Sequence, residues 1–137
     1  MFNLHGYGPS ILEGTLLTIE VSLASLAIAM LLGILGALAK LSKSVSLRIT
    51  AQSYTTIIRG IPDLVLMLLI FFGGQVFINQ MAPKLGYDAY IDINPFIAGV
   101  MTIGFIFGAY MTETFRGGIL AVPNGQLEAA AAYGMTR

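Results

Sequence analysis

Two carboxylates, Asp63 and Glu113, stand at the edges of long uncharged stretches, where a charged side chain is unusual. An acid inside a membrane-spanning segment is energetically costly and usually marks the route of an ion or a substrate. Such an acid, facing a polar cavity, could bind a cationic side chain. We therefore take Asp63 and Glu113, together with Tyr110 three residues before Glu113, as candidate residues of a substrate pathway.

Each acid also has a structural interpretation. Asp63 would open a helix, where the macrodipole favours a carboxylate, and Arg59 four residues earlier could pair with it. Glu113 and Arg116 are three residues apart on one helical face, so they could form an ion pair while Arg116 extends to the membrane surface. The sequence predicts Arg59 and Arg116 as structural ion-pair residues, and it leaves both interpretations open for the two acids.

Covalent catalysis and metal binding lack their usual residues. There is no cysteine, which excludes disulfides, thiolate nucleophiles and cysteine-ligated metals. The single histidine, His5, lies among Gly and Pro near the N-terminus and is interpreted as an ordinary surface residue. No Gly-x4-Gly-Lys-Ser/Thr phosphate loop is present, so any ATP hydrolysis must occur on another chain. The formal net charge of zero predicts no nucleic-acid partner. Because the cysteines, a histidine cluster and a phosphate loop are absent from the sequence, we also expect no cofactor, no metal and no enzymatic activity.

The composition indicates an all-α protein whose solvent is a lipid bilayer. Apolar residues make up 56% of the chain and charged residues 10%, and the mean hydropathy is +0.82. Soluble domains carry about 25% charged residues. Since about 20 helical residues cross a hydrocarbon core of ~30 Å, we expect three transmembrane spans, at about residues 14–39, 61–78 and 95–116.

Small residues recur at helical spacing in two of these spans. Ala29, Gly33 and Ala37 share one face of the first span, and Gly104 and Gly108 share a face of the third. Small side chains let helix backbones approach closely, so the third span is expected to pack there against the second span, a fifth span or a partner subunit.

Residues 44–59 have helical spacing and form either an interfacial helix or the first part of a long second span. Gly60 and Pro62 bend or restart the chain after them.

Basic residues are distributed unequally between the loops. Residues 40–59 carry four of them and residues 79–94 only one, Lys84; the four are Lys40, Lys43, Arg48 and Arg59. Because basic residues stay on the cytoplasmic side, residues 40–59 are predicted inside and the N-terminus outside. The start of the chain lacks the basic residues of a signal peptide, so we interpret the first apolar segment as a retained span.

The C-terminal stretch has the pattern of a short surface helix. Gly117-Gly118 is expected to break the third span, and Pro123-Asn124-Gly125 is typical of a turn. Residues 126–133 are rich in helix formers, and Gly134 would end that helix. A helix at the membrane surface in this place could serve as a docking element.

Three motifs resemble the permeases of ABC importers. Glu128-Ala129-Ala130, followed after three residues by Gly134, is similar to the start of the EAA loop of that family. The wider run, ETFRGG at 113–118 and VPNGQLEAA at 122–130, resembles the branch that carries polar amino acids. The stretch RGIPDLV at 59–65 resembles the same branch, and with Asp63 it looks most like the permeases for histidine, lysine, arginine and ornithine.

This resemblance implies a MetI-like permease fold in the bacterial inner membrane. The EAA loop, residues 123–137, would be cytoplasmic and would couple to the ATPase through Gly125, Glu128, Ala129, Ala130 and Gly134. The implied partners are a homologous or identical second permease subunit, two ATPase subunits and a periplasmic amino-acid-binding protein. The chains of that family continue into two more spans, so the sequence is expected to be an N-terminal fragment.

Two other functions are consistent with the same residues. A secondary transporter or channel could use Asp63 and Glu113 to conduct or couple ions. A membrane-anchor subunit would have no pathway of its own, and both acids would then be structural.

Overall fold

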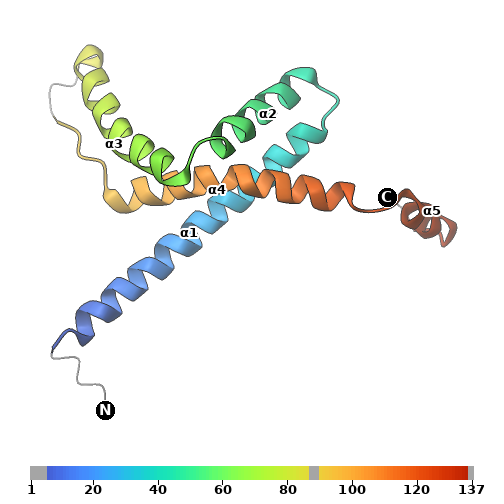
Figure 1. Ribbon diagram of the computed structural model, residues 1–137, viewed down its shortest axis with the longest axis horizontal. Coiled ribbons are helices and arrows are strands. Elements are labelled where there is room, and N and C mark those ends of the chain that lie inside the picture. The colour runs from blue at the N-terminus through green and yellow to red at the C-terminus, as the bar shows by residue number, and fades with distance from the viewer. Residues whose placement is uncertain (1–5, 87–89, 136–137) are drawn as a thin grey trace.

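The computed structural model describes residues 6–86 and 90–135, and every element among them is helical. His5 lies outside this part of the chain. Figure 1 shows α4 crossing α1, with α2 and α3 on one side of α4 and α5 beyond its end. The elements are α1 (Gly8–Leu41), α2 (Val45–Arg59), α3 (Asp63–Met81), the 3-10 turn η1 (Pro83–Leu85), α4 (Pro95–Leu120) and α5 (Asn124–Ala132).

Three helices, α1, α3 and α4, are long and apolar enough to cross a membrane, which agrees with the predicted all-α transmembrane fold. Each of them extends beyond the apolar stretch from which it was predicted. Glu13, Lys40 and Met81, for example, all lie within helices but outside the predicted spans. The reason is that backbone hydrogen bonding continues past the last apolar residue, whereas hydropathy marks only the part that suits lipid.

The prediction of a helix break at Gly117-Gly118 is wrong. Helix α4 continues through both glycines, and the Ala121 N–H donates to the Gly117 carbonyl at 3.0 Å. A glycine weakens a helix by about 1 kcal/mol, which is too little to stop one that is otherwise stable. The predicted turn is also displaced, since Pro123 is the N-cap of α5 and Asn124 already belongs to the helix.

Helices α1 and α4 cross closely through the two rows of small residues. Ala29, Gly33 and Ala37 are buried, and a Cβ placed on Gly33 would lie 2.5 Å from the Met111 Cβ. A Cβ on Gly104 would lie 2.7 Å from the Ile28 Cγ2. The close packing is as predicted, but its partner is not: the glycines of α4 meet α1.

Helix α2 is a separate element, and the chain changes direction after it. Gly60 and Ile61 lie between α2 and Pro62, the N-cap of α3, whose ring cannot donate a backbone hydrogen bond. Thr55 and Ile58 of α2 are buried. Leu66 of α3 joins Ile58 in one apolar cluster with Ile106 and Ala109 of α4. The break between α2 and α3 is therefore held against the middle of α4 (Figure 1).

Two amide side chains of α3 hold the segment that leads into α4. Asn79 donates to the Ile91 carbonyl at 2.9 Å and accepts from the Ile91 N–H at 2.8 Å. The Gln75 side-chain oxygen accepts from the Ile93 N–H at 3.1 Å. Asn94 then caps α4 by accepting from two backbone N–H groups. These bonds set where α4 begins relative to α3.

Candidate functional site

The break between α2 and α3 places Asp63 beside α4. Asp63 is the first residue of α3, and its Oδ1 accepts a hydrogen bond from the Tyr110 hydroxyl at 2.8 Å. The expected pairing of Asp63 with Arg59 is not observed, and Arg59 instead lies near Glu113. The spacing of four residues brings side chains together only on a continuous helix, and Gly60–Pro62 interrupts it.

Glu113 is surrounded by cations from three helices. Lys40 of α1 donates to Glu113 Oε1, and Arg116 of α4 has its Nη1 3.6 Å from Oε2. Arg59 of α2 has its Nη1 4.0 Å from Oε1. We call these four residues the Glu113 cluster. Three positive charges thus share one carboxylate at the place where α1, α2 and α4 meet.

Lys40 is the member of the cluster that the sequence analysis missed. It was interpreted only as one of the basic residues that set the orientation, yet its side chain is 3% exposed. A signal was available, because Lys40 follows Ala29, Gly33 and Ala37 at helical spacing and therefore lies on the same buried face. A lysine on a face of small residues indicates a buried partner, since a buried charge must be paired.

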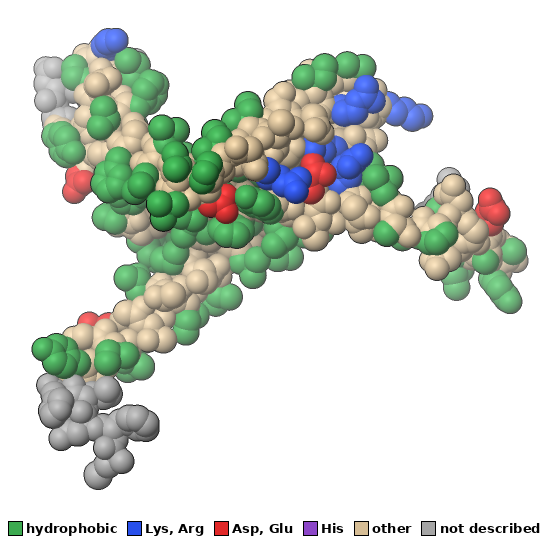
Figure 2. All heavy atoms as spheres, viewed as in Figure 1, with side chains coloured by type: hydrophobic (Ala, Val, Ile, Leu, Met, Phe, Trp, Pro, Cys, Tyr) green, Lys and Arg blue, Asp and Glu red, His purple; other side chains and the backbone are tan. Residues whose placement is uncertain are grey.

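A polar hollow of about 320 Å³ opens between α2 and α4. Figure 2 shows basic and acidic side chains gathered in this angle of the molecule. The Arg59 Cζ lies 5.6 Å from the centre of the Tyr110 ring. Of the two acids, Glu113 lines this hollow and Asp63 does not. Asp63 is connected to the hollow through its hydrogen bond with Tyr110, which is one of the lining residues. Its lining residues are Gln52, Thr55, Thr56, Arg59, Gly60, Tyr110 and Glu113.

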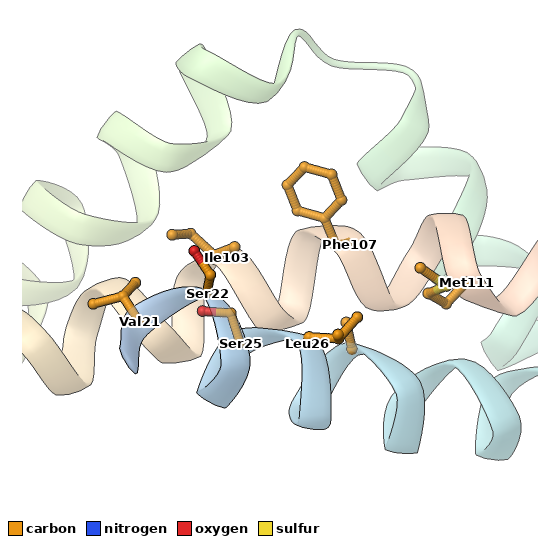
Figure 3. A pocket seen from close by; sticks show the side chains of 8 residues that line it. Val21, Ser22, Ser25, Leu26, Ile103, Phe107 and Met111 are labelled. Atoms are coloured by element: carbon orange, nitrogen blue, oxygen red, sulfur yellow. The ribbon is translucent and has the colours of Figure 1, made fainter. Parts of the chain in front are cut away.

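A second hollow, of about 230 Å³, lies between α1 and α4 and is almost entirely apolar (Figure 3). Its polar members are Ser22, which donates to the Thr18 carbonyl at 2.7 Å, and Ser25, whose buried hydroxyl has no hydrogen-bond partner among the described residues. This arrangement offers no charged group that could bind a substrate.

No three His, Cys, Asp or Glu side chains in residues 6–86 and 90–135 are placed to hold a metal ion together. The candidate site is therefore described by its charged and hydroxyl groups.

The residues expected to couple to an ATPase lie on α5 or, in the case of Gly134, just after its end, and none of them lines the polar hollow. Gly134 has a φ of +77°, and its N–H donates to the Ala131 carbonyl at 3.0 Å. The Met135 N–H donates to the Ala130 carbonyl at 3.1 Å, so the helix ends at Gly134 by the expected left-handed cap. In Figure 1, α5 projects from the end of α4. It carries Gly125, Glu128, Ala129 and Ala130.

Comparison with known proteins gives a consistent result. Residues 23–137 match the family described as binding-protein-dependent transport system inner membrane component. The chain is 52% identical over 133 residues to the histidine/lysine/arginine/ornithine transport system permease protein HisQ of Salmonella typhimurium, covering 97% of this chain and 58% of that protein. The corresponding protein of Escherichia coli is 49% identical over 134 residues, with 98% and 58% covered. The octopine transport system permease protein OccQ of Rhizobium meliloti is 39% identical, with 98% and 56% covered.

A solved structure has the same arrangement of helices. It is the crystal structure of an amino acid ABC transporter with histidines, which matches with a TM-score of 0.65 and 34% identity. The match covers 93% of this chain and 57% of that one. The chain thus spans somewhat more than half the length of the relatives it matches. With a family match over residues 23–137 and identities of up to 52%, the chain belongs to the binding-protein-dependent transport system inner membrane components.

Proposed function

We propose that this chain forms part of the permease subunit of an ATP-driven importer for amino acids with basic side chains. The observation that carries the proposal is the Asp63 carboxylate, held at the break between α2 and α3 and hydrogen-bonded to Tyr110. Asp63 is the first residue of a helix long and apolar enough to cross a membrane, and an acid in such a segment usually marks the route of a substrate. The relatives whose names include histidine, lysine, arginine and ornithine support a basic substrate.

In this proposal Asp63 and Tyr110 contact the substrate on its way through the membrane. Asp63 has no cation within ion-pair distance in the part of the chain that the structure describes, so its charge is available to a ligand. Glu113 lines the polar hollow, and its carboxylate holds Lys40 and Arg116 in place beside it. The pathway is therefore asymmetric in charge, with an acid at one end and a group of cations at the other.

Helix α5 is the proposed contact with an ATPase subunit. It is exposed, and a short turn joins it to α4, which runs unbroken back to Glu113 and Tyr110. A rigid helix transmits a displacement of one end to the other. Movement of α5, driven by ATP hydrolysis on the ATPase, would thus reposition the substrate residues without any covalent step on this chain.

The complete transporter would contain a second permease subunit, homologous or identical, two ATPase subunits and a periplasmic amino-acid-binding protein. The chain would lie in the bacterial inner membrane with its N-terminus outside. The excess of basic residues in 40–59 over 79–94 supports this orientation, because α5 is then cytoplasmic and can reach an ATPase.

The substrate role is tested by Asp63→Asn in the complete transporter, reconstituted in vesicles. The variant keeps the shape of the side chain and its hydrogen bond but loses the charge. We expect arginine uptake to fall roughly ten- to a hundred-fold, as for the loss of one charge-assisted hydrogen bond. The amount of bound ATPase should be unchanged. Asp92→Asn, which removes an exposed acid before α4, is the matched control and should transport normally.

Two results would contradict the proposal. Arginine uptake equal to that of the parent would return Asp63 to a structural role at the start of α3. Uptake that follows an ion gradient and needs no ATPase subunit would instead favour an ion-coupled transporter.

The docking role of α5 is tested separately by Glu128→Lys. Reversing this exposed charge should reduce co-purification of the ATPase while the permease still inserts. Lys84→Glu, an exposed charge in η1 after α3, controls for a general effect of charge reversal. Normal ATPase binding by the Glu128→Lys permease would argue against α5 as the contact.

A further inference from the structure

We propose that Arg59 binds the α-carboxylate of the transported amino acid while Asp63 binds the cation of its side chain. This inference deepens the proposed function and rests on it. It gives a role to Arg59, which the sequence analysis treated as a structural ion-pair residue.

The first observation is that the oxygens of Glu113 are already occupied. Lys40 donates to Oε1, and Arg116 lies 3.6 Å from Oε2. Arg59 reaches Oε1 only at 4.0 Å and makes no hydrogen bond to that carboxylate. With three cations around one carboxylate, the Glu113 cluster keeps a net positive charge of two. A positive hollow of this kind favours a negatively charged ligand group.

The second observation is that Arg59 is the cation of the cluster that a ligand can reach. The Lys40 side chain is 3% exposed, whereas that of Arg59 is 44% exposed and lines the polar hollow. Arg116 is also exposed but does not line the hollow. A guanidinium presents its donors in a planar fork that matches the two oxygens of a carboxylate.

The third observation is the position of the opposite charge. Tyr110 separates the two groups: its ring centre is 5.6 Å from the Arg59 Cζ, and its hydroxyl is 2.8 Å from Asp63 Oδ1. A positive group thus lies over the ring of this tyrosine, and a negative group lies at its hydroxyl. An extended basic amino acid has the complementary pattern, with a carboxylate at one end and a cation at the other.

The inference is tested by calorimetric binding to the complete transporter in detergent, without the binding protein. The ligands are arginine and agmatine, which is arginine without its carboxylate. Arg59→Gln should weaken arginine binding roughly ten- to a hundred-fold, as for the loss of a charge-assisted hydrogen bond, and leave agmatine binding unchanged. Asp63→Asn should weaken the binding of both ligands. Arg59→Lys, which keeps the charge but not the fork, should bind arginine with intermediate affinity.

The outcomes separate the two proposals. If Arg59→Gln binds arginine like the parent, or loses arginine and agmatine equally, Arg59 does not recognise the carboxylate. If inorganic phosphate binds the parent and not Arg59→Gln, while arginine binding is the same in both, Arg59 holds a phosphate group, as of a lipid, and the inference is wrong. If Asp63→Asn also binds arginine normally, the proposed function itself fails.

Discussion

The buried ion pair between Lys40 and Glu113 can be measured by replacing each residue, and then both, with methionine. The Lys40 side chain is 3% exposed, so Glu113→Met leaves an ammonium group buried without a carboxylate near it in the described structure. Removing one partner of a buried pair typically costs about 3–5 kcal/mol of unfolding free energy. Lys40→Met should cost less, about 1.5–3 kcal/mol, the value of a hydrogen bond to a charged group.

The smaller cost of Lys40→Met follows from what remains around Glu113. This carboxylate is 24% exposed and keeps Arg116 at 3.6 Å and Arg59 at 4.0 Å. In the double variant no charge is buried, and both arginines, at 44% and 42% exposure, can extend to water. Replacing a buried pair by apolar residues is often neutral. We therefore expect the double variant to be more stable than Glu113→Met alone.

The assay is unfolding of the complete permease in mixed detergent and dodecyl sulfate micelles, followed by circular dichroism. The coupling free energy is the difference between the loss in the double variant and the sum of the single losses. If the loss in the double variant equals the sum of the two single losses to within about 0.5 kcal/mol, the residues are independent, and the pairing between α1 and α4 is refuted.

Three further predictions follow from the packing and the orientation. Ser25→Ala removes a buried hydroxyl without a partner, so the unfolding free energy should rise by about 1 kcal/mol in the same assay; a fall would show that the hydroxyl is bonded. Gly104→Leu should cost about 1–3 kcal/mol through overpacking, whereas Gly99→Leu, with open space around it, should not; equal effects would contradict the close crossing. A cysteine at Gly86 should react with an impermeant thiol reagent from outside and one at Ser44 should not, and the reverse would invert the topology.

The local features of this chain were predictable because each depends on residues within a few helical turns. The apolar stretches specify three spans, since hydrophobic length is a property of a continuous segment. Gly134 ends α5 as expected, because only the backbone conformation of that residue is involved. The small residues of α1 indicated close packing because they share a face within a few turns of one helix. They did not indicate which helix would pack against that face.

The break at Gly117-Gly118 shows the limit of local propensity. Two glycines weaken a helix, but α4 continues through them to Leu120 because its hydrogen-bond ladder remains available. The chain turns at Ala121 and Val122, just before Pro123, whose ring lacks the backbone donor that a continuing helix would need.

The pairing of charges was decided by the tertiary structure. Lys40 and Glu113 are 73 residues apart, and Asp63 and Tyr110 are 47 apart. Which of them meet depends on how α1, α2 and α3 cross α4, and the crossing depends on the fit of small residues such as Gly33 and on the turn at Pro62. Composition and spacing thus determined that the predicted second and third spans each carry one acid. The packing of the helices alone determined that Glu113 is held by cations and that Asp63 is left to a tyrosine, because side chains far apart in sequence meet only once the backbones are in place.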